Sequence, residues 1–165
     1  MSSQRWNFPE NQASPYFDYA MAELLPQSGG MALLDRVLDA GEDYLTAGLT
    51  VREDSLFSWP DHTVPAWVGI EYMAQTVAAY AGYQRKRRGQ AMQVGFLLGT
   101  RFYQCSVGSF PCGACLRVHV EKVMEGAYDM AAFDCRIEGE NISASATINV
   151  FLPKDAKGFL AEKGL

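Results

Sequence analysis

One stretch of the sequence predicts a buried helix that carries a single carboxylate: Val64-Pro65-Ala66-Trp67-Val68-Gly69-Ile70-Glu71-Tyr72-Met73-Ala74-Gln75. Proline suits the first turn of a helix, so we expect the helix over residues 65–88, with Gly89 as its C-cap. Apolar residues recur at helical spacing and small residues cover the opposite face, which is typical of a helix buried on several sides. Because a lone charge is costly to bury, Glu71 should either be well partnered or take part in chemistry.

A histidine in the loop before this helix favours acid–base chemistry. His62 is one of two histidines in the chain, and histidine and glutamate are a common acid–base pair. Gln75 follows Glu71 by one helical turn, so its amide can orient the carboxylate. At about 1.5 Å per residue, His62 and Glu71 lie roughly 10 Å apart along the axis. One chain therefore brings both to a single substrate carbon only if the loop folds back. The second histidine, His119, alternates within a strand and is expected to be structural.

Strand-like segments surround the helix in an asymmetric order. A short helix over residues 18–25 stops at Pro26. Two expected strands, 31–38 and 44–51, precede the long helix, and four follow it: 93–105, 114–124, 128–137 and 142–152. The turns between them are short, which implies antiparallel neighbours. The sequence therefore predicts an α+β domain in which an antiparallel sheet curls around one helix.

Length and composition are those of a single globular domain. The chain has 165 residues, of which 48% are hydrophobic and 20% charged, enough to form one real core. We expect a flexible N-terminal arm over residues 1–17, the domain over 18–153 and a polar tail over 154–165. The net charge of −5 argues against nucleic-acid binding, which needs many cations facing phosphates.

Targeting and metal-binding signals are weak. No run of about 18 apolar residues predicts a membrane span, and the first residues lack the features of a signal peptide, so a cytoplasmic location is expected. Cys112 and Cys115 have the spacing of a metal or redox pair, but no second close pair or suitably spaced histidine accompanies them. Cys105 and Cys135 complete the set. We expect four structural thiols, no metal and no cofactor.

Several stretches resemble the β-hydroxyacyl-acyl-carrier-protein dehydratases of the hotdog fold. The opening of those enzymes is similar to Leu24-Leu25-Pro26-Gln27-Ser28-Gly29-Gly30-Met31-Ala32-Leu33-Leu34-Asp35-Arg36-Val37. Their central helix, with its Pro-Gly start, catalytic carboxylate and Ala-Gln pair, resembles Pro65-Ala66, Glu71 and Ala74-Gln75. Their tunnel strand and Pro-Gly turn resemble Leu97-Leu98-Gly99-Thr100-Arg101-Phe102 and Phe110-Pro111-Cys112-Gly113. The helix most resembles that of dehydratase-like proteins of aryl polyene biosynthesis, through Glu71-Tyr72-Met73-Ala74-Gln75-Thr76.

The resemblance implies a hotdog domain of about six strands around a central helix, acting as a dehydratase on 3-hydroxyacyl chains of an acyl carrier protein. His62 would remove the α-proton, Glu71 would assist departure of the hydroxyl group, and Gln75 would hold Glu71. Backbone amides near the helix start would stabilise the thioester oxygen. The residues expected to bind substrate are Ala66, Trp67, Val68, Phe96, Leu97, Leu98 and Gly99.

Three positions depart from the family pattern. Gln27 stands where the family usually has histidine, and Ala66 replaces the glycine at the helix start. The family histidine lies in a His-Phe-Pro-Gly loop further upstream of the carboxylate than His62 does. The family implies a dimer in which His62 of one subunit meets Glu71 of the other. We therefore expect a homodimer or an oligomer of dimers, with a second hotdog protein as a further partner.

Other interpretations stay open. Glu71 as a structural carboxylate and His62 as a surface residue are the plainer alternatives. The run Arg85-Lys86-Arg87-Arg88 is either a solvated helix end that favours the helix dipole or a docking site for an acidic acyl carrier protein. The chain could also be a non-catalytic hotdog partner of a sister dehydratase, or an acyl-thioester hydrolase, because fold does not fix function.

Overall fold

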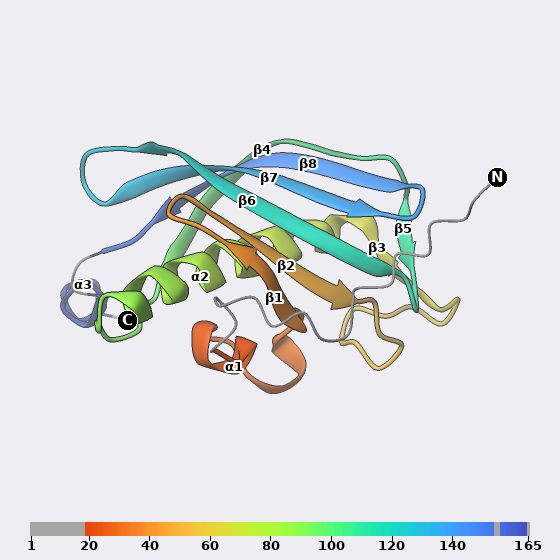
Figure 1. Ribbon diagram of the computed structural model, residues 1–165, viewed down its shortest axis with the longest axis horizontal. Coiled ribbons are helices and arrows are strands. Elements are labelled where there is room, and N and C mark those ends of the chain that lie inside the picture. The colour runs from red at the N-terminus through yellow and green to blue at the C-terminus, as the bar shows by residue number, and fades with distance from the viewer. Residues whose placement is uncertain (1–18, 154–155, 165) are drawn as a thin grey trace.

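One long helix lies against an antiparallel sheet in the computed structural model, which describes residues 19–153 and 156–164 (Figure 1). The six-stranded sheet has the order β1-β2-β6-β7-β8-β4, and all neighbours are antiparallel. Its strands are β1 (Arg36–Ala40), β2 (Tyr44–Thr50), β6 (Cys115–Glu125), β7 (Met130–Gly139), β8 (Ile142–Phe151) and β4 (Phe96–Cys105). The predicted α+β architecture, with six strands around one helix, is confirmed.

The central helix α2 (Gly69–Arg87) is buried on several sides, as its small residues predicted. It follows a short 3₁₀ helix, η2 (Ala66–Val68). Tyr80 meets Phe133 of β7 edge-on, with ring centroids 5.4 Å apart, and the fully buried Met73 belongs to the same core. No helix in the described residues is long and apolar enough to cross a membrane.

The segment before β1 differs from the predicted strand over residues 31–38. The 3₁₀ helix η1 (Gly29–Met31) occupies its start, and the strand begins only at Arg36. The reason is a side chain: Gln75 binds the carbonyl oxygen of Met31 and the N–H of Leu33. In a strand, the Met31 carbonyl and the Leu33 N–H would bond a neighbouring strand. Here they bond the Gln75 side chain of α2 instead.

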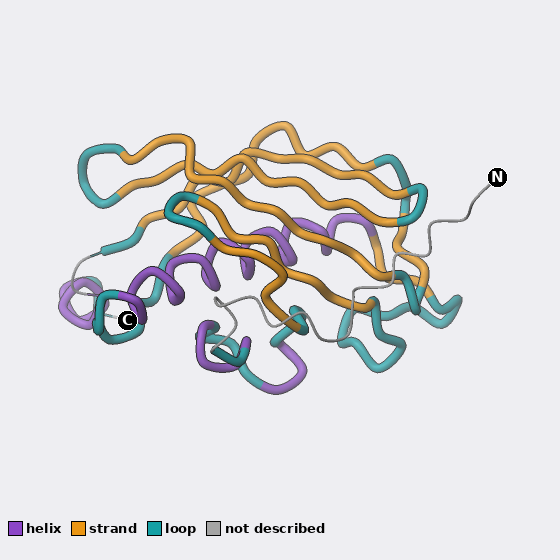
Figure 2. Tube along the Cα trace, viewed as in Figure 1, coloured by secondary structure: helices purple, strands orange, loops and turns teal. Residues whose placement is uncertain are grey.

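Short elements at the two ends of the chain agree in part with the sequence. The first helix, α1 (Met21–Leu24), lies within the predicted range of 18–25, although residue 18 and the arm over 1–17 lie outside the described residues. In the predicted polar tail the structure has a helix, α3 (Ala156–Glu162). Figure 2 shows the long loop between β2 and β3 at the end of the sheet where α2 begins.

A second, two-stranded sheet fixes the start of α2. It pairs β3 (Thr63–Pro65) with β5 (Ser109–Pro111), and neither strand was predicted because three residues give no readable alternation. The N–H of Ala66 donates to the carbonyl of Gly108 at 3.0 Å, and the hydroxyl of Tyr103 donates to the carbonyl of Ala66. A Cβ on Gly69 would press on Phe110 and Ile137. The helix therefore enters the sheet at one fixed place.

Candidate active site

Glu71 is held by Gln75, whose side chain is completely buried. The amide Nε2 of Gln75 donates to Glu71 Oε1 at 2.9 Å and to the carbonyl oxygen of Met31 at 2.7 Å, and its Oε1 accepts from the N–H of Leu33 at 2.9 Å. The amide orientation is fixed, because a carbonyl only accepts and a backbone N–H only donates. The half-buried Glu71 carboxylate is thus held at one end by a rigid donor.

The carboxylate lines a mostly apolar cavity between α2 and strands β4 and β8. Its floor is the small-residue face of the helix, and the ten steps from Glu71 to Ala81 span about 15 Å along the axis. Such a lining, with a few polar groups, suits an acyl chain. The cavity is lined by Pro26, Gln27, Glu71, Ala74, Val77, Ala78, Ala81, Gln93, Gly95, Phe96, Leu97, Val150 and Leu152.

His62 lies away from this cavity in its own chain. Its side chain is 73% exposed, and Nδ1 lies 2.9 Å from Oε1 of the equally exposed Glu53. The backbone of His62 has a positive φ of 59°, and its carbonyl accepts from the N–H of Cys112. One chain therefore does not bring imidazole and carboxylate together, and their meeting across a dimer stays a prediction.

His119 lies on β6, with Nδ1 2.8 Å from Oγ1 of Thr46. Burial, together with the nearby Arg136, lowers the pKa of His119 below its ordinary value of 6.5. The neutral imidazole is therefore favoured within a strand, in keeping with a structural residue. Within the described part of the chain, no group of three or more His, Cys, Asp or Glu side chains is arranged to hold a metal ion.

The predicted substrate-binding residues fall into two groups. Phe96 and Leu97 line the Glu71 cavity, whereas Leu98 is 55% exposed on β4 and Gly99 is half-buried beside it. At the helix start, Val68 is completely buried, and Trp67 is 57% exposed and meets Phe57 edge-on.

One expected oxyanion donor is excluded. The N–H of Ala66 is occupied by Gly108, so the prediction that it faces a thioester oxygen is wrong. The small β3–β5 sheet brings the Gly108 carbonyl to this position.

The basic run at the end of α2 is largely engaged within the chain. Arg85 donates to the carbonyl of Ala91 and, through Nη1, to Oε1 of Gln93 at 2.7 Å. Lys86 binds Glu23 at 2.9 Å and lies over the ring of Tyr19. The other two, Arg87 and Arg88, are exposed, and the guanidinium of Arg87 lies over Tyr83. The docking surface for a carrier protein stays a prediction, and of its four residues only Arg87 and Arg88 are exposed.

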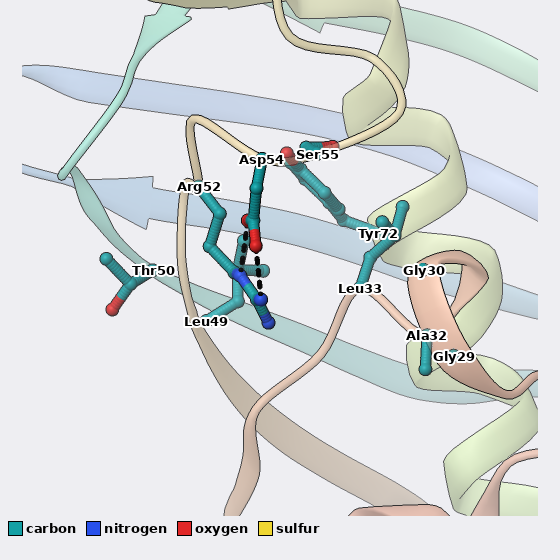
Figure 3. A pocket seen from close by; sticks show the side chains of 10 residues that line it. All are labelled: Gly29, Gly30, Ala32, Leu33, Leu49, Thr50, Arg52, Asp54, Ser55 and Tyr72. Atoms are coloured by element: carbon teal, nitrogen blue, oxygen red, sulfur yellow. Dashed lines mark hydrogen bonds and ion pairs between the residues drawn. The ribbon is translucent and has the colours of Figure 1, made fainter.

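A second pocket, which the sequence did not predict, lies beside the first turns of α2 (Figure 3). Arg52 and Asp54 form two hydrogen bonds at its rim, both 2.9 Å. Figure 3 shows Tyr72 reaching from the helix toward Ser55. Burial raises the pKa of Tyr72 far above its ordinary value of 10.0, so its hydroxyl stays protonated. The residues lining this pocket are Gly29, Gly30, Ala32, Leu33, Leu49, Thr50, Arg52, Asp54, Ser55 and Tyr72.

Comparison with known proteins gives the family. The family model for ApeP-like proteins, described as ApeP dehydratase, matches residues 19–161. The chain belongs to the ApeP-like dehydratase family. No curated protein matches it. The expected resemblance to hotdog dehydratases, and to the dehydratase-like proteins of aryl polyene biosynthesis, is confirmed by this ApeP-like match together with the solved structures.

Solved structures agree with the ApeP-like assignment. A chain of the dehydratase heterocomplex ApeI:P from Xenorhabdus doucetiae is similar at 26% identity with a TM-score of 0.79, over 87% of this chain and 97% of that one. A hypothetical thioesterase with coenzyme A from Streptococcus pneumoniae TIGR4 is similar at 13% identity with a TM-score of 0.55, over 71% of this chain and 84% of that one. The Escherichia coli PaaI protein from the phenylacetic acid degradation operon is similar at 11% identity with a TM-score of 0.54, over 70% of this chain and 80% of that one. The last two show the hotdog fold alone.

Proposed function

We propose that this protein contributes the carboxylate half of a 3-hydroxyacyl-acyl-carrier-protein dehydratase site. The observation that carries the proposal is Glu71, held by the buried amide of Gln75 on the wall of an apolar cavity. Membership of the ApeP-like dehydratase family supports the reaction class. The cavity supports an acyl chain as the substrate, because its lining is mostly hydrocarbon.

The reaction is an elimination in which every proton is accounted for. A base takes the proton from C2, the C2–C3 double bond forms, and the C3–O bond breaks. The Glu71 carboxyl group gives its proton to the departing hydroxyl, which leaves as water. The base then releases the C2 proton to solvent, and the Glu71 carboxylate takes up a proton from solvent. Gln75 keeps the acid in place through one hydrogen bond to Oε1. Such a positioned acid contributes about a hundredfold to ten-thousandfold in rate.

The base in this proposal comes from across a subunit interface. Neither histidine of the chain lines the Glu71 cavity, so a second protomer supplies the imidazole. In a homodimer that group is His62 of the second copy. The edge strand β4 supports such a contact, because it is ten residues long and exposes Leu97 and Leu98 beside the cavity.

The other candidate is a subunit that completes a sister dehydratase without acting alone. Two observations favour it. His62 is exposed and paired with Glu53, and the similar structure from Xenorhabdus doucetiae is described as a dehydratase heterocomplex. In that case a second hotdog protein supplies the base, and Glu71 and Gln75 either join the site or shape it.

Conversion of a 3-hydroxyacyl carrier protein to its enoyl form tests the proposal, with the chain alone and with a candidate hotdog partner, followed by mass spectrometry. We expect Glu71→Gln to lower the rate by about a hundredfold or more. His62→Gln should have the same effect only if the homodimer is the enzyme. The matched control is Glu140→Gln, at an exposed glutamate in the turn between β7 and β8, which should leave the rate nearly unchanged.

Full activity of Glu71→Gln, in every combination of subunits, would refute the assignment of Glu71 as the acid. Activity that resides wholly in the partner would establish the non-catalytic role. Release of free thiol from acyl substrates without an enoyl product would instead identify a hydrolase. The carrier-protein surface is tested in the same assay, where Arg87→Glu with Arg88→Glu should raise KM and leave kcat nearly unchanged.

A further inference from the structure

The pocket beside the first turns of α2 is separate from the Glu71 cavity. It has a volume of about 260 Å³, and none of the described residues lines both. Four segments meet there: the stretch that contains η1, the end of β2, the loop after β2, and α2 through Tyr72 (Figure 3). Pockets for drug-sized ligands measure about 300–1,000 Å³, so this one suits a smaller molecule.

A buried tyrosine points an unpaired hydroxyl group into this pocket. Tyr72 is 3% exposed, and Figure 3 shows its ring reaching from α2 toward Asp54 and Ser55. Within the described residues its hydroxyl has no hydrogen-bond partner. The side-chain atoms there that are both sealed from water and unpaired belong to Gln27 and Gln93 alone, so the Tyr72 hydroxyl is open to the pocket. Burial keeps its pKa far above 10.0, which makes it a neutral donor.

Two further donors border the same space. Arg52 binds Asp54 through Nε and Nη2, at 2.9 Å each. Its Nη1 has no hydrogen bond within the part of the chain that the structure describes. Ser55 accepts at Oγ from the N–H of Phe57 at 3.3 Å, so its own proton remains to be donated. The pocket therefore offers more donors than it uses.

We propose that this pocket binds a small organic carboxylate, held by the Tyr72 and Ser55 hydroxyls and by Nη1 of Arg52. A carboxylate only accepts hydrogen bonds, so it matches a lining rich in donors, and its bonds to a guanidinium are strong ones. The side chains of Leu33 and Leu49 cover its carbon body. The inference goes beyond the proposed dehydratase function and does not depend on it.

Calorimetry with benzoate and benzamide at neutral pH tests the proposal. The two probes have the same ring and nearly the same shape, but only benzoate is charged and accepts at two oxygens. For the full chain, alone and with a hotdog partner, benzoate should bind about tenfold more tightly than benzamide. Formate, a carboxylate without a carbon body, should bind more weakly than benzoate, because it leaves Leu33 and Leu49 uncovered.

Tyr72→Phe removes a single hydroxyl group and should weaken benzoate binding by about tenfold. The matched control is Tyr128→Phe, at a tyrosine that is 87% exposed, which should keep the full affinity. Because the Tyr72 hydroxyl has no partner in the free protein, its loss should not lower the unfolding temperature. A structural hydroxyl would behave in the opposite way, so thermal unfolding separates the two roles.

Charge at the rim gives a second test. The side chains of Arg52 and Asp54 are 61% and 71% exposed, so substitution there should leave the fold intact. Asp54→Asn removes the carboxylate that repels the probe and competes for the guanidinium, and it should tighten benzoate binding about threefold. Arg52→Gln should remove most of the preference for benzoate over benzamide.

Three results would overturn the inference: no binding of benzoate at millimolar concentration, equal binding of benzoate and benzamide, or full benzoate affinity in Tyr72→Phe. If Tyr72→Phe does not fold, the two rim variants give an independent answer. None of these measurements involves turnover, so a failure of the dehydratase assay leaves the binding result unaffected.

Discussion

At the scale of single residues, the side-chain amide of Gln75 makes the hydrogen bonds that the backbone of a neighbouring strand would make. It offers a donor to the Met31 carbonyl and an acceptor to the Leu33 N–H, as a neighbouring strand would. Its second N–H reaches Glu71. The segment before β1 and the candidate acid are therefore positioned by the same buried group.

Replacing that amide should be costly to stability. Gln75→Met keeps the length of the side chain but leaves the Met31 carbonyl and the Leu33 N–H without partners. A buried group left unpaired costs about 1–3 kcal/mol. Because both contacts are only part-buried, we expect the free energy of unfolding to fall by about 1–3 kcal/mol in total. Urea denaturation measures it. Gln104→Met, at an exposed glutamine, is the control and should change stability by less than about 0.5 kcal/mol. An equally small change in Gln75→Met would contradict the prediction.

Sequence reasoning reached part of this arrangement. The spacing of Glu71 and Gln75 predicted their contact, because residues four apart on a helix are neighbours. It did not predict the other two bonds of Gln75, since its partners lie more than forty positions earlier in the chain. Gln93, in the cavity wall, was missed for a different reason: it is held by Arg85, whose charge suggested a surface role.

At the scale of elements, helix α1 packs on α2 at a glycine. A Cβ on Gly82 would overlap the carbonyl oxygen of Leu24. Gly82→Ala should gain about 1 kcal/mol from helix propensity, but overpacking in a tight contact costs about 1–3 kcal/mol. Because the opposing atom is backbone, no rotamer change relieves the overlap, and we expect a net loss of stability in thermal unfolding.

A control separates propensity from packing. Ala78→Gly, four positions earlier on the same helix, should lose about 1 kcal/mol through propensity, together with the effect of any lost methyl contact. If Gly82→Ala instead raises the unfolding temperature, α1 is free to move away from α2, and the close contact is not part of the stable fold.

The elements themselves were predictable to different degrees. The long helix and six strands follow from helical and alternating periods in the sequence. Helix α2 begins at Gly69 after a 3₁₀ turn and not at Pro65, because Pro65 belongs to the small β3–β5 sheet. That sheet pairs Val64 with Phe110, 46 positions later in the chain. A pattern within one short segment cannot predict such a pairing.

At the scale of the whole molecule, β4 is the long edge of the sheet. Leu98 is 55% exposed and Phe102 is 80% exposed. The backbone of Phe102 has a positive φ of 56°, which is uncommon for a non-glycine residue, and the strand register shifts next to it. A long apolar edge invites pairing with another chain. We expect this edge to form the subunit contact.

Charge placed on that edge should break the contact. In Leu98→Asp with Phe102→Asp, the new carboxylates would have to be buried at the interface, which is costly without partners. Light scattering coupled to size-exclusion chromatography should then report the mass of one chain, where the unmodified protein reports at least two. Val123→Asp, at an apolar residue on β6 that is 51% exposed, should leave the mass unchanged. An unmodified chain that elutes as a monomer, alone and with a hotdog partner, would rule out the shared site.

The final turn of α2 faces both inward and outward. Arg85 binds the carbonyl of Ala91 and the side chain of Gln93 in the segment that leads from the helix to β4. Arg87 and Arg88 are exposed, with the Arg87 guanidinium over the ring of Tyr83. Because Gln93 lines the Glu71 cavity, a partner that bound the two exposed arginines would contact the same helical turn from which Arg85 reaches the cavity wall.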